Sequence, residues 1–375
     1  DYIETGASTA QAGILEDMPR LDYSGSCPAL LLEPQRTNLL PHSEYIGAWT
    51  NYASSESLTN ETSPEGKENV YKIIEDTANS AHTIRYQYSF SNITYTISAF
   101  LKGDTRNKAA LAFGGASLGG MSFEERSGAF DLSSGVIDRE PIGGSATIDE
   151  FDNGWYRCSI TITPLSAGTA NFDIYILDEN GNITYQGDGS SGIYVYGAQL
   201  EEGSYPTSYI PTYGSSVTRS RDDMDTTFSS ALTSSGSVSV LFDFGAAYIS
   251  DSNSTTNNLE FVFDNGDRII YNQNSVSQHR IELNVNGGTE FIYKTFGILR
   301  SVPAKICVVV TNKEYRIFVN GQLTSSVGSF TGTADWTAAE RFASDINEPI
   351  GVTPIKQMLL FPTALTDSEA IALTL

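Results

Sequence analysis

The sequence is poor in cysteine and contains no long apolar run. Its three cysteines, Cys27, Cys158 and Cys307, lie far apart in 375 residues, so they predict neither a disulfide framework nor a zinc site. Cys158 and Cys307 stand within apolar segments, where we expect buried thiols. No stretch reaches the roughly 18 apolar residues that a membrane-spanning helix needs. We therefore expect no membrane partner.

Basic residues are also scarce. The chain has 22 Lys and Arg against 45 Asp and Glu, a net charge of −23, while charged residues make up only 18%. A surface of this sign repels phosphate backbones, so we expect no nucleic-acid partner. The sequence begins with Asp1-Tyr2-Ile3-Glu4, which is neither a signal peptide nor a Met start. We expect a mature or excised fragment of a longer chain.

Turn formers and aromatic residues are abundant, with 33 Gly, 20 Tyr and 18 Phe among many Ser and Thr. Such a composition is typical of β-sheet surfaces and tight turns rather than of helical bundles. Strand-like segments, most of them alternating with period two, occupy 95–100, 158–163, 172–176, 193–196, 238–244, 259–263, 280–285, 306–310 and 315–319. Asn-Gly pairs begin at 153, 180, 265, 286 and 320, and this pair favours type I′ hairpin turns.

These patterns predict an all-β protein of two antiparallel β-sandwich (jelly-roll) domains. We expect an irregular N-terminal arm over 1–41, a jelly-roll module over 42–219 and a second sandwich over 220–375. A Ser/Thr/Pro-rich stretch over 204–236 marks the boundary between the sandwiches. One helix is predicted, because Thr366 to Glu369 form a capping box near the C-terminus.

Three stretches resemble tail and virion structural proteins of tailed bacteriophages. The first, 20–23 with 27–40, resembles a linker in those proteins that is followed by a segment like 42–45 and a Trp, here Trp49. The second, 153–157 with 196–203 and 205–212, resembles the final strands of their jelly-roll module, which is similar to carbohydrate-binding modules. The third, 355–358 through 364–369, resembles the end of a concanavalin A-like or laminin-G-like lectin domain.

The resemblance implies a non-enzymatic tail-fibre or surface protein of a phage virion that binds host-surface polysaccharide. It also implies contacts with other virion subunits, a homo-oligomer that is commonly a trimer in such proteins, and a virion-surface, extracellular location. Two alternatives stay open. One is a purely structural virion subunit, and the other is a polysaccharide lyase or hydrolase, or its accessory module.

Glycan binding needs aromatic faces to stack on sugar C–H groups, with amides, carboxylates or Arg to bond hydroxyls. In the segment 85–88, Arg85 and Gln87 should face one way and Tyr86 and Tyr88 the other, and either pair is a candidate for the binding face. Alternatively the tyrosines fill the core. The full candidate set is Trp49, Tyr52, Arg85, Tyr86, Gln87, Tyr88, Tyr271, His279, Arg280 and Trp336.

Two of these candidates are tryptophans in different settings. Trp336 follows the loop-like run 331–335, where we expect an exposed indole ring. Trp49 lies with Tyr52 near a domain edge, either as a binding platform or as a seal on the core. The net charge favours neutral glycans over polyanionic ones, unless a local cluster such as one around Arg85 intervenes.

Calcium is the one cofactor to weigh. Asp178, Asn180 and Asn182 place oxygens at alternate positions, as calcium loops do, but the glycine and the twelfth residue do not fit the EF-hand spacing. A hairpin turn explains the same residues. The sequence therefore predicts no cofactor, with calcium at this loop as a weak candidate.

Catalysis is the rival hypothesis. Glycosidases need two carboxylates roughly 5 to 10 Å apart, whereas the adjacent Glu124 and Glu125 point to opposite faces of a strand. The run 280–283 resembles the Arg-x-Glu-Leu strand of one alginate-lyase family, and 293–294 resembles its catalytic Tyr strand, but the Gln-Ile-His element is absent. We expect no enzymatic activity.

Overall fold

The structure is a computed structural model that describes residues 21–22, 29–115, 118–220, 222, 225–227, 236–245, 257–263, 265–273, 278–299, 302–324, 327–336, 339–346 and 353–375. The chain divides into two compact units. The first holds residues 36–219, and the second holds residues from 220 onward together with the described residues up to Gln35. Both are built of antiparallel strands, which confirms the predicted all-β sandwich fold. None of the described helices is long and apolar enough to cross a membrane.

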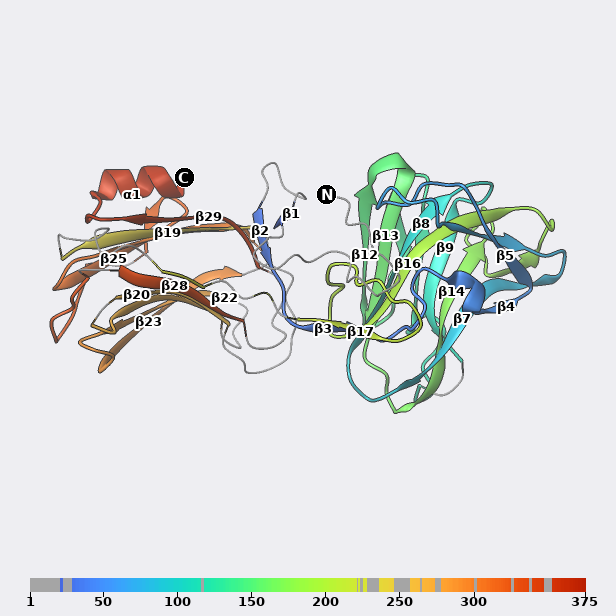
Figure 1. Ribbon diagram of the computed structural model, residues 1–375, viewed down its shortest axis with the longest axis horizontal. Helices are drawn as coiled ribbons and strands as arrows, with labels where there is room; N and C mark the ends of the chain where they lie inside the picture. The colour runs from blue at the N-terminus through green and yellow to red at the C-terminus, as the bar shows by residue number, and fades with distance from the viewer. Residues whose placement is uncertain are drawn as a thin grey trace, which may run out of the picture. The chain divides into compact units, whose positions relative to one another are not determined.

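The first unit is a sandwich of two sheets (Figure 1). Sheet I has the strand order β12 (Ser145–Phe151), β13 (Trp155–Ile162), β8 (Tyr95–Gly103), β16 (Gly192–Glu202), β6 (Tyr71–Glu75) and β5 (Ser54–Leu58). Sheet II has the order β11 (Val136–Arg139), β10 (Ser127–Asp131), β9 (Lys108–Gly114), β14 (Gly168–Leu177), β7 (Asn79–Phe90) and β15 (Thr184–Gln186), with β4 (Thr50–Tyr52) also paired to β7. Two short 3-10 helices are η1 (Ile46–Ala48) and η2 (Asp152–Gly154).

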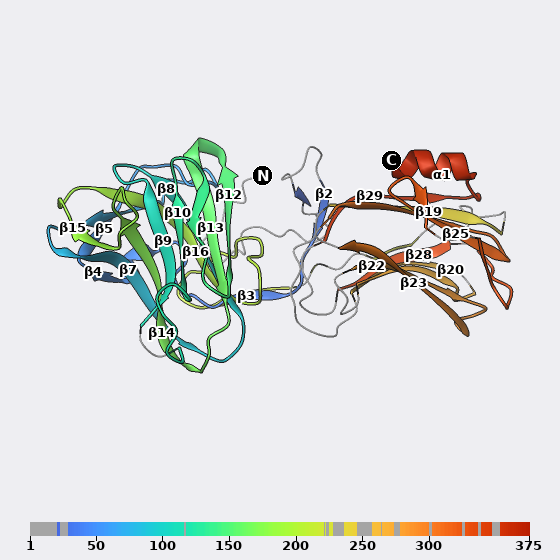
Figure 2. The same cartoon turned by 180° about the vertical axis from the view of Figure 1, so that it is seen from behind.

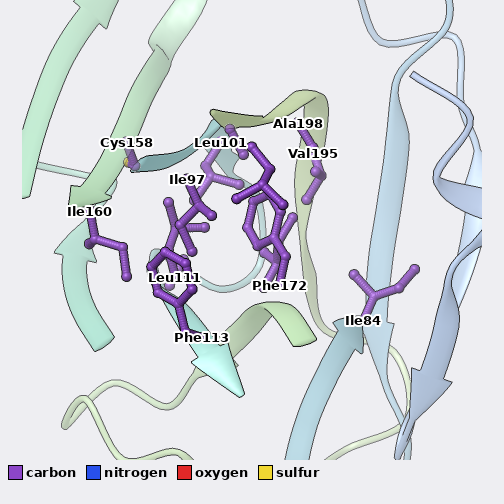
Figure 3. Close-up of a cluster of buried hydrophobic side chains, with 14 of the residues drawn as sticks. Ile84, Ile97, Leu101, Leu111, Phe113, Cys158, Ile160, Phe172, Val195 and Ala198 are labelled. Atoms are coloured by element: carbon purple, nitrogen blue, oxygen red, sulfur yellow. The ribbon is translucent and has the colours of Figure 1, made fainter. Parts of the chain in front are cut away.

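Alternate side chains of the two sheets make the core of the first unit. Ile97 and Leu101 of β8 meet Leu111 and Phe113 of β9 and Phe172 of β14, as Figure 3 shows. All five are fully buried. The period-two alternation expected over 95–100 and 172–176 corresponds to side chains that face the core in turn along β8 and β14.

The outer face of sheet I is covered by loops. Phe100, Trp155 and Tyr196 project there and are buried, with Tyr209 packed against them. The Trp155 indole donates a hydrogen bond of 2.9 Å to the carbonyl of Thr62. Trp155 is therefore a packing residue.

Part of the segment 27–40 is joined directly to the segments 196–203 and 205–212, which lie at the end of β16 and just after it. The fully buried Asn38 amide donates to the carbonyls of Ala198, at 3.2 Å, and Ile210, at 2.8 Å, and its oxygen accepts from the Leu200 amide at 3.2 Å. The Gln199 side chain accepts from the Ile210 amide at 2.6 Å. Buried amides need such partners, so the two motifs form one structural unit.

The second unit has its own two sheets (Figure 2). Sheet III has the order β1 (Leu21–Asp22), β2 (Ala29–Leu32), β29 (Thr353–Phe361), β19 (Val238–Phe244), β24 (Ala304–Val310), β25 (Glu314–Val319) and β26 (Gln322–Leu323), with β27 (Gly328–Ser329) on β25. Sheet IV has the order β18 (Asp225–Thr227), β28 (Ala339–Ile346), β20 (Asn257–Phe263), β21 (Arg268–Gln273), β22 (Gln278–Val285) and β23 (Glu290–Leu299).

Helix α1 (Asp367–Thr374) covers the outer face of sheet III (Figure 1). Ala370 of the helix is buried against Leu241, Cys307 and Phe318 of the sheet. The predicted capping box is present, with the Thr366 side chain accepting from the Glu369 amide. Burial raises the pKa of the Cys307 thiol to about 12. Cys158 is fully buried as well, whereas Cys27 lies outside the described residues.

The segment expected to be an irregular arm contains paired strands where it is described. The backbone of β2 joins the edge of β29, with Leu30 opposite Ile355. Further on, β3 (Arg36–Asn38) pairs with β17 (Val217–Arg219), so that Arg36 lies opposite Arg219. The arm thus belongs to the second unit up to Gln35 and to the first unit from Arg36.

Three of the five Asn-Gly pairs adopt positive φ at both residues, as a type I′ turn requires. They begin at Asn153, Asn286 and Asn320, with φ of 61°, 57° and 47° at the asparagines. In the pairs at 180 and 265 only the glycine has positive φ. The prediction of hairpin geometry at both residues therefore holds at three positions and fails at two.

Candidate functional site

The outer face of sheet II is the best candidate for a binding site in the first unit. Arg85 and Gln87 of β7 lie on this face, while Tyr86 and Tyr88 pack against the core between the sheets. The predicted division of the four side chains is correct. The tyrosines are packing residues, and the polar pair is available to a ligand.

Arg85 lies directly opposite Asp173 of β14. Its Nε is 3.6 Å from Asp173 Oδ1, and the Tyr175 hydroxyl donates a hydrogen bond of 2.9 Å to Oδ2. Asp173 is 1% exposed, and its Oδ1 accepts no hydrogen bond from the described residues. Burial raises the pKa of the Asp173 carboxyl to about 6, and the positive charges of Arg85 and Arg126 oppose that rise. A buried carboxylate is costly, so this one needs an explanation.

Space for the carboxylate comes from Gly114 of β9. A Cβ atom at that position would lie 1.7 Å from Asp173 Oδ2. Any larger residue would displace the carboxylate. The glycine at the end of an otherwise apolar strand therefore has a local steric purpose.

Tyr52 provides an aromatic ring beside this pair. It ends β4, which pairs with β7 so that Tyr52 lies opposite Thr83 and Thr50 opposite Arg85. The Arg85 guanidinium carbon is 4.6 Å from the centre of the Tyr52 ring. The tyrosine remains 49% exposed. The arginine thus holds the ring while leaving half of the side chain open to solvent.

Two more arginines continue the polar face. The Phe123 ring packs edge-on against Tyr175 at 5.7 Å and lies between Arg126, at 5.4 Å, and Arg139, at 5.5 Å. We call Arg85, Arg126 and Arg139 the arginine strip. It is linked through Phe123, Tyr175 and Asp173 and ends at Tyr52.

Neutral hydrogen-bonding groups flank the strip. Gln87 of β7 and Asn171 of β14 are register partners, two positions beyond Arg85 and Asp173 and on the same face. Gln87 is exposed and Asn171 partly exposed. Amides offer both donors and acceptors, which suits a ligand rich in hydroxyl groups.

Trp49 is not a platform. It is buried, its indole donates to the His42 carbonyl at 3.0 Å, and its ring packs against Phe172 at 5.3 Å and Tyr86 at 5.8 Å. The second of the two sequence hypotheses, a seal on the core, is therefore correct. Only Tyr52 of the two neighbours is open.

In the second unit, the prediction of an exposed Trp336 is wrong. The side chain is 0% exposed, packs against Phe263 and donates to the Thr311 carbonyl at 2.8 Å. The loop before it turns inward because the buried Asp267 carboxylate accepts the Asp335 amide at 2.8 Å. Trp336 cannot stack on a sugar.

Tyr271 and His279 are also buried, so neither is accessible to a ligand. The Tyr271 hydroxyl is 2.7 Å from His279 Nδ1, and the other ring nitrogen is 3.2 Å from the Val302 carbonyl. Arg280, by contrast, lies at the surface with its guanidinium carbon 4.1 Å from the centre of the Tyr293 ring. Of the candidates in this unit, only Arg280 remains accessible.

The weak calcium candidate is a tight turn between β14 and β15, and these two strands pair with β7 rather than with each other. Asp178 Oδ1 accepts from the backbone amides of Asn180, at 2.9 Å, and Asn182, at 2.7 Å, and Oδ2 accepts from the Asn182 side chain at 2.9 Å. These hydrogen bonds lower the pKa of the Asp178 carboxyl even though its burial opposes them. The three residues bond to one another. Within the described part of the chain, no group of three or more His, Cys, Asp or Glu side chains could hold a metal ion.

Sequence reasoning missed Asp173, Tyr175, Phe123 and Arg126. One signal for Asp173 was present, because it is the only charged residue in the strand-like run 172–176, flanked on both sides by apolar residues. Its partner Arg85 is far away in sequence. Only the pairing of β7 with β14 brings the two charges together.

No family model matches the sequence, and no curated protein is significantly similar to it. Three solved structures illustrate what its fold is similar to. The CBM40 domain of the Ruminococcus gnavus IT-sialidase, bound to α2,3-sialyllactose, is 17% identical, with a TM-score of 0.28 over 39% of this chain and 84% of that one. Domain 4 of the Geobacillus stearothermophilus arabinanase AbnA, in complex with arabinotriose, is 17% identical, with a TM-score of 0.29 over 38% and 69%.

The third is the binding domain of botulinum neurotoxin DC in complex with SialylT. It is 15% identical, with a TM-score of 0.33 over 41% of this chain and 39% of that one. The first two structures contain a bound oligosaccharide, and the third is the binding domain of a toxin. At such identities and TM-scores they do not indicate which ligand this chain binds, and the argument for function rests on the site itself.

Proposed function

We propose that this chain is a non-enzymatic glycan-binding protein whose first unit holds carbohydrate on the outer face of sheet II. Tyr52 would stack on the C–H face of a sugar, as half-exposed aromatic rings do. Arg85, Gln87 and Asn171 would bond its hydroxyl groups. The half-exposed ring and the polar groups lie on adjacent strands, as a stacking site requires.

The observation that carries the proposal is Asp173. A carboxylate that is 1% exposed, with one oxygen that accepts no hydrogen bond from the described residues, costs stability wherever it occurs. Perturbed, costly charges cluster at functional sites. Here the charge faces Arg85 and fixes the arginine that supports the stacking ring. A purely structural sheet face would have no use for this arrangement.

The lack of catalysis is part of the proposal. Glycosidases need a pair of carboxylates roughly 5 to 10 Å apart. Among the described site residues on β4, β7, β9 and β14, Asp173 is the single carboxylate, and two adjacent residues, Tyr175 and Arg85, occupy it. This arrangement favours binding over bond cleavage.

We also propose that the protein belongs to the surface or tail fibre of a phage virion and contributes to host adhesion. The support is the resemblance of the linker and the motif after β16, which Asn38 joins into one structural unit. Neighbouring genes for portal, tail-tube or capsid proteins would support this role. A genome context of secreted catabolic enzymes would contradict it.

A glycan array followed by affinity gel electrophoresis of the whole chain tests the binding function. We expect retention on at least one polysaccharide, and Tyr52→Ala should weaken it about ten-fold. Tyr45→Ala is the matched control, because Tyr45 is similarly exposed but packs beside Tyr71 of sheet I. Wild-type protein that binds no glycan would overturn the proposal. Equal losses of retention in both variants would indicate that the glycan does not bind on sheet II.

A further inference from the structure

The arginine strip stands out against the charge of the whole protein. The chain carries a net charge of −23 and only 22 basic residues. Three of those residues, Arg85, Arg126 and Arg139, lie along the one sheet face described above. A cluster of scarce charges on one face is unexpected for residues that serve only solubility.

Most donors of the strip are unused by the protein. Arg126 donates from Nη1 to the Phe113 carbonyl at 2.5 Å, and Arg139 donates from Nη2 to the Ser127 hydroxyl at 2.7 Å. The Nε of each of the three arginines is buried without a hydrogen-bond partner among the described residues. A guanidinium has five N–H donors in a planar fork. Because each Nε is buried, a ligand can reach the strip only through the Nη groups.

Acidic side chains lie near the arginine strip, and they differ in how far they can neutralise its positive charge. Asp173 faces Arg85, and the burial that raises its pKa to about 6 makes its negative charge partial near that pH. Glu125 accepts the Ser122 amide of its own loop at 2.6 Å, while Glu124 is exposed. Lys108, further along β9, pairs with Asp131 at 3.3 Å and also with Asp138. Among the described interactions of these acids, only those of Asp173 reach arginines of the strip.

We propose that the arginine strip selects glycans that carry carboxylate groups over otherwise identical neutral ones. This rests on the proposed function, since it names the ligand class of the same site. Arginine binds carboxylates through paired charge-assisted hydrogen bonds, and the fixed Phe123 ring keeps two of the guanidinium planes in place. Tyr52 supplies the stacking surface at the other end of the strip. The preference for neutral glycans expected from net charge alone is reversed at this face.

The test compares matched pairs of ligands with the full chain at constant ionic strength. The probes are polygalacturonate and its methyl ester, alginate and carboxyl-reduced alginate, and sialyllactose and lactose. We expect at least one acidic member to bind about ten-fold or more tightly than its neutral partner. Added salt should weaken that binding, because it screens exposed charges.

Variants of the strip then assign the preference. Arg126→Gln and Arg139→Gln should each weaken acidic binding several-fold and leave neutral binding unchanged, while Arg126→Lys retains part of the preference. Arg268→Gln, on the outer face of sheet IV, is the charge-matched control. Circular dichroism confirms that the variants are folded.

The outcomes separate the two claims. Equal or tighter binding of the neutral partners, or variants that leave the acid preference intact, would overturn the selectivity while the glycan-binding function stands. No binding of any acidic or neutral probe, together with an empty glycan array, would overturn both.

Discussion

The two units have a similar arrangement of sheet faces and differ in the burial of one acidic side chain. Each covers the outer face of one sheet, sheet I with loops and sheet III with helix α1, and each carries an arginine over a half-exposed tyrosine on the other sheet. In the second unit this pair, Arg280 and Tyr293, is accompanied by a partly exposed acid, Glu282. In the first unit the acid, Asp173, is buried.

Burial changes how much the same chemical groups contribute to the free energy of folding. A surface arginine, tyrosine and carboxylate are solvated and contribute little either way. A carboxylate with one oxygen lacking a hydrogen bond destabilises the fold, so it persists only where the surroundings hold it in place. The two faces have similar composition and differ in the free-energy cost of their acidic group, and this difference is the reason for proposing the binding role for the first unit.

The largest expected effect concerns the cores beneath these faces. Trp336→Ala should lower the free energy of unfolding of the second unit by roughly 3 to 5 kcal/mol, because it empties a large buried volume and leaves the Thr311 carbonyl without its donor. Calorimetric or urea unfolding measures the change. A loss below about 1 kcal/mol would show that the indole is not packed as described.

A smaller effect, with a distinctive pH dependence, is expected for Asp173→Asn. The carboxyl pKa in the folded protein, about 6, lies above the ordinary value of 3.8, so the folded state takes up a proton first as pH falls. Stability from this group is complete below about pH 4 and is lost as pH rises through 6. An amide cannot ionise, so the variant should be more stable than wild type at pH 7.5, by up to about 3 kcal/mol.

This difference should vanish near pH 4, and urea unfolding across pH 4 to 8 measures it. Glu282→Gln on the other unit is the matched control, with an expected change within about 0.5 kcal/mol at pH 7.5. If Asp173→Asn destabilises the protein equally at every pH, the ionised carboxylate does not lower the stability of the folded protein. The contrast between the two faces would then fail.

The smallest effect is expected for Tyr293→Ala. Removing a half-exposed ring from Arg280 should change the free energy of unfolding by about 1 kcal/mol or less. Glycan retention should stay at the wild-type level. If retention falls as much as for Tyr52→Ala, the second unit also binds glycan, and the functional distinction between the faces disappears.

The sequence was sufficient for β8, β14 and β22, because apolar side chains that face the core alternate in these strands with Thr, Ser, Asp or Glu on the other face. It was insufficient for β9, where residues on both faces are buried: Leu111 lies in the core, while Ala110 and Ala112 lie under Phe123 and Tyr175. Such a strand shows no alternation. Gly114 of β9 can be assigned to the site only when the structure shows that Asp173 lies beside it.

The candidate site was predictable in part for a related reason. Arg85, Gln87 and Tyr52 were found because they are local signals of sugar contact. The prediction for Trp336 was wrong because its loop context gives no sign that Asp267 holds the preceding residue, Asp335, inward. Asp173 was overlooked because its role depends on Arg85, its register partner on β7. The pairing of strands that are far apart in sequence cannot be inferred from one sequence.

The paired ribbon of β3 and β17 has a mechanical consequence. The chain enters the first unit at Arg36 and leaves it at Arg219, and these residues are register partners. Among the described residues, the first unit is therefore an insertion, anchored by β2 on one side and by the chain from Ser220 on the other. A load applied at the first unit is shared by two covalent tethers, and a cut in either one leaves the units attached.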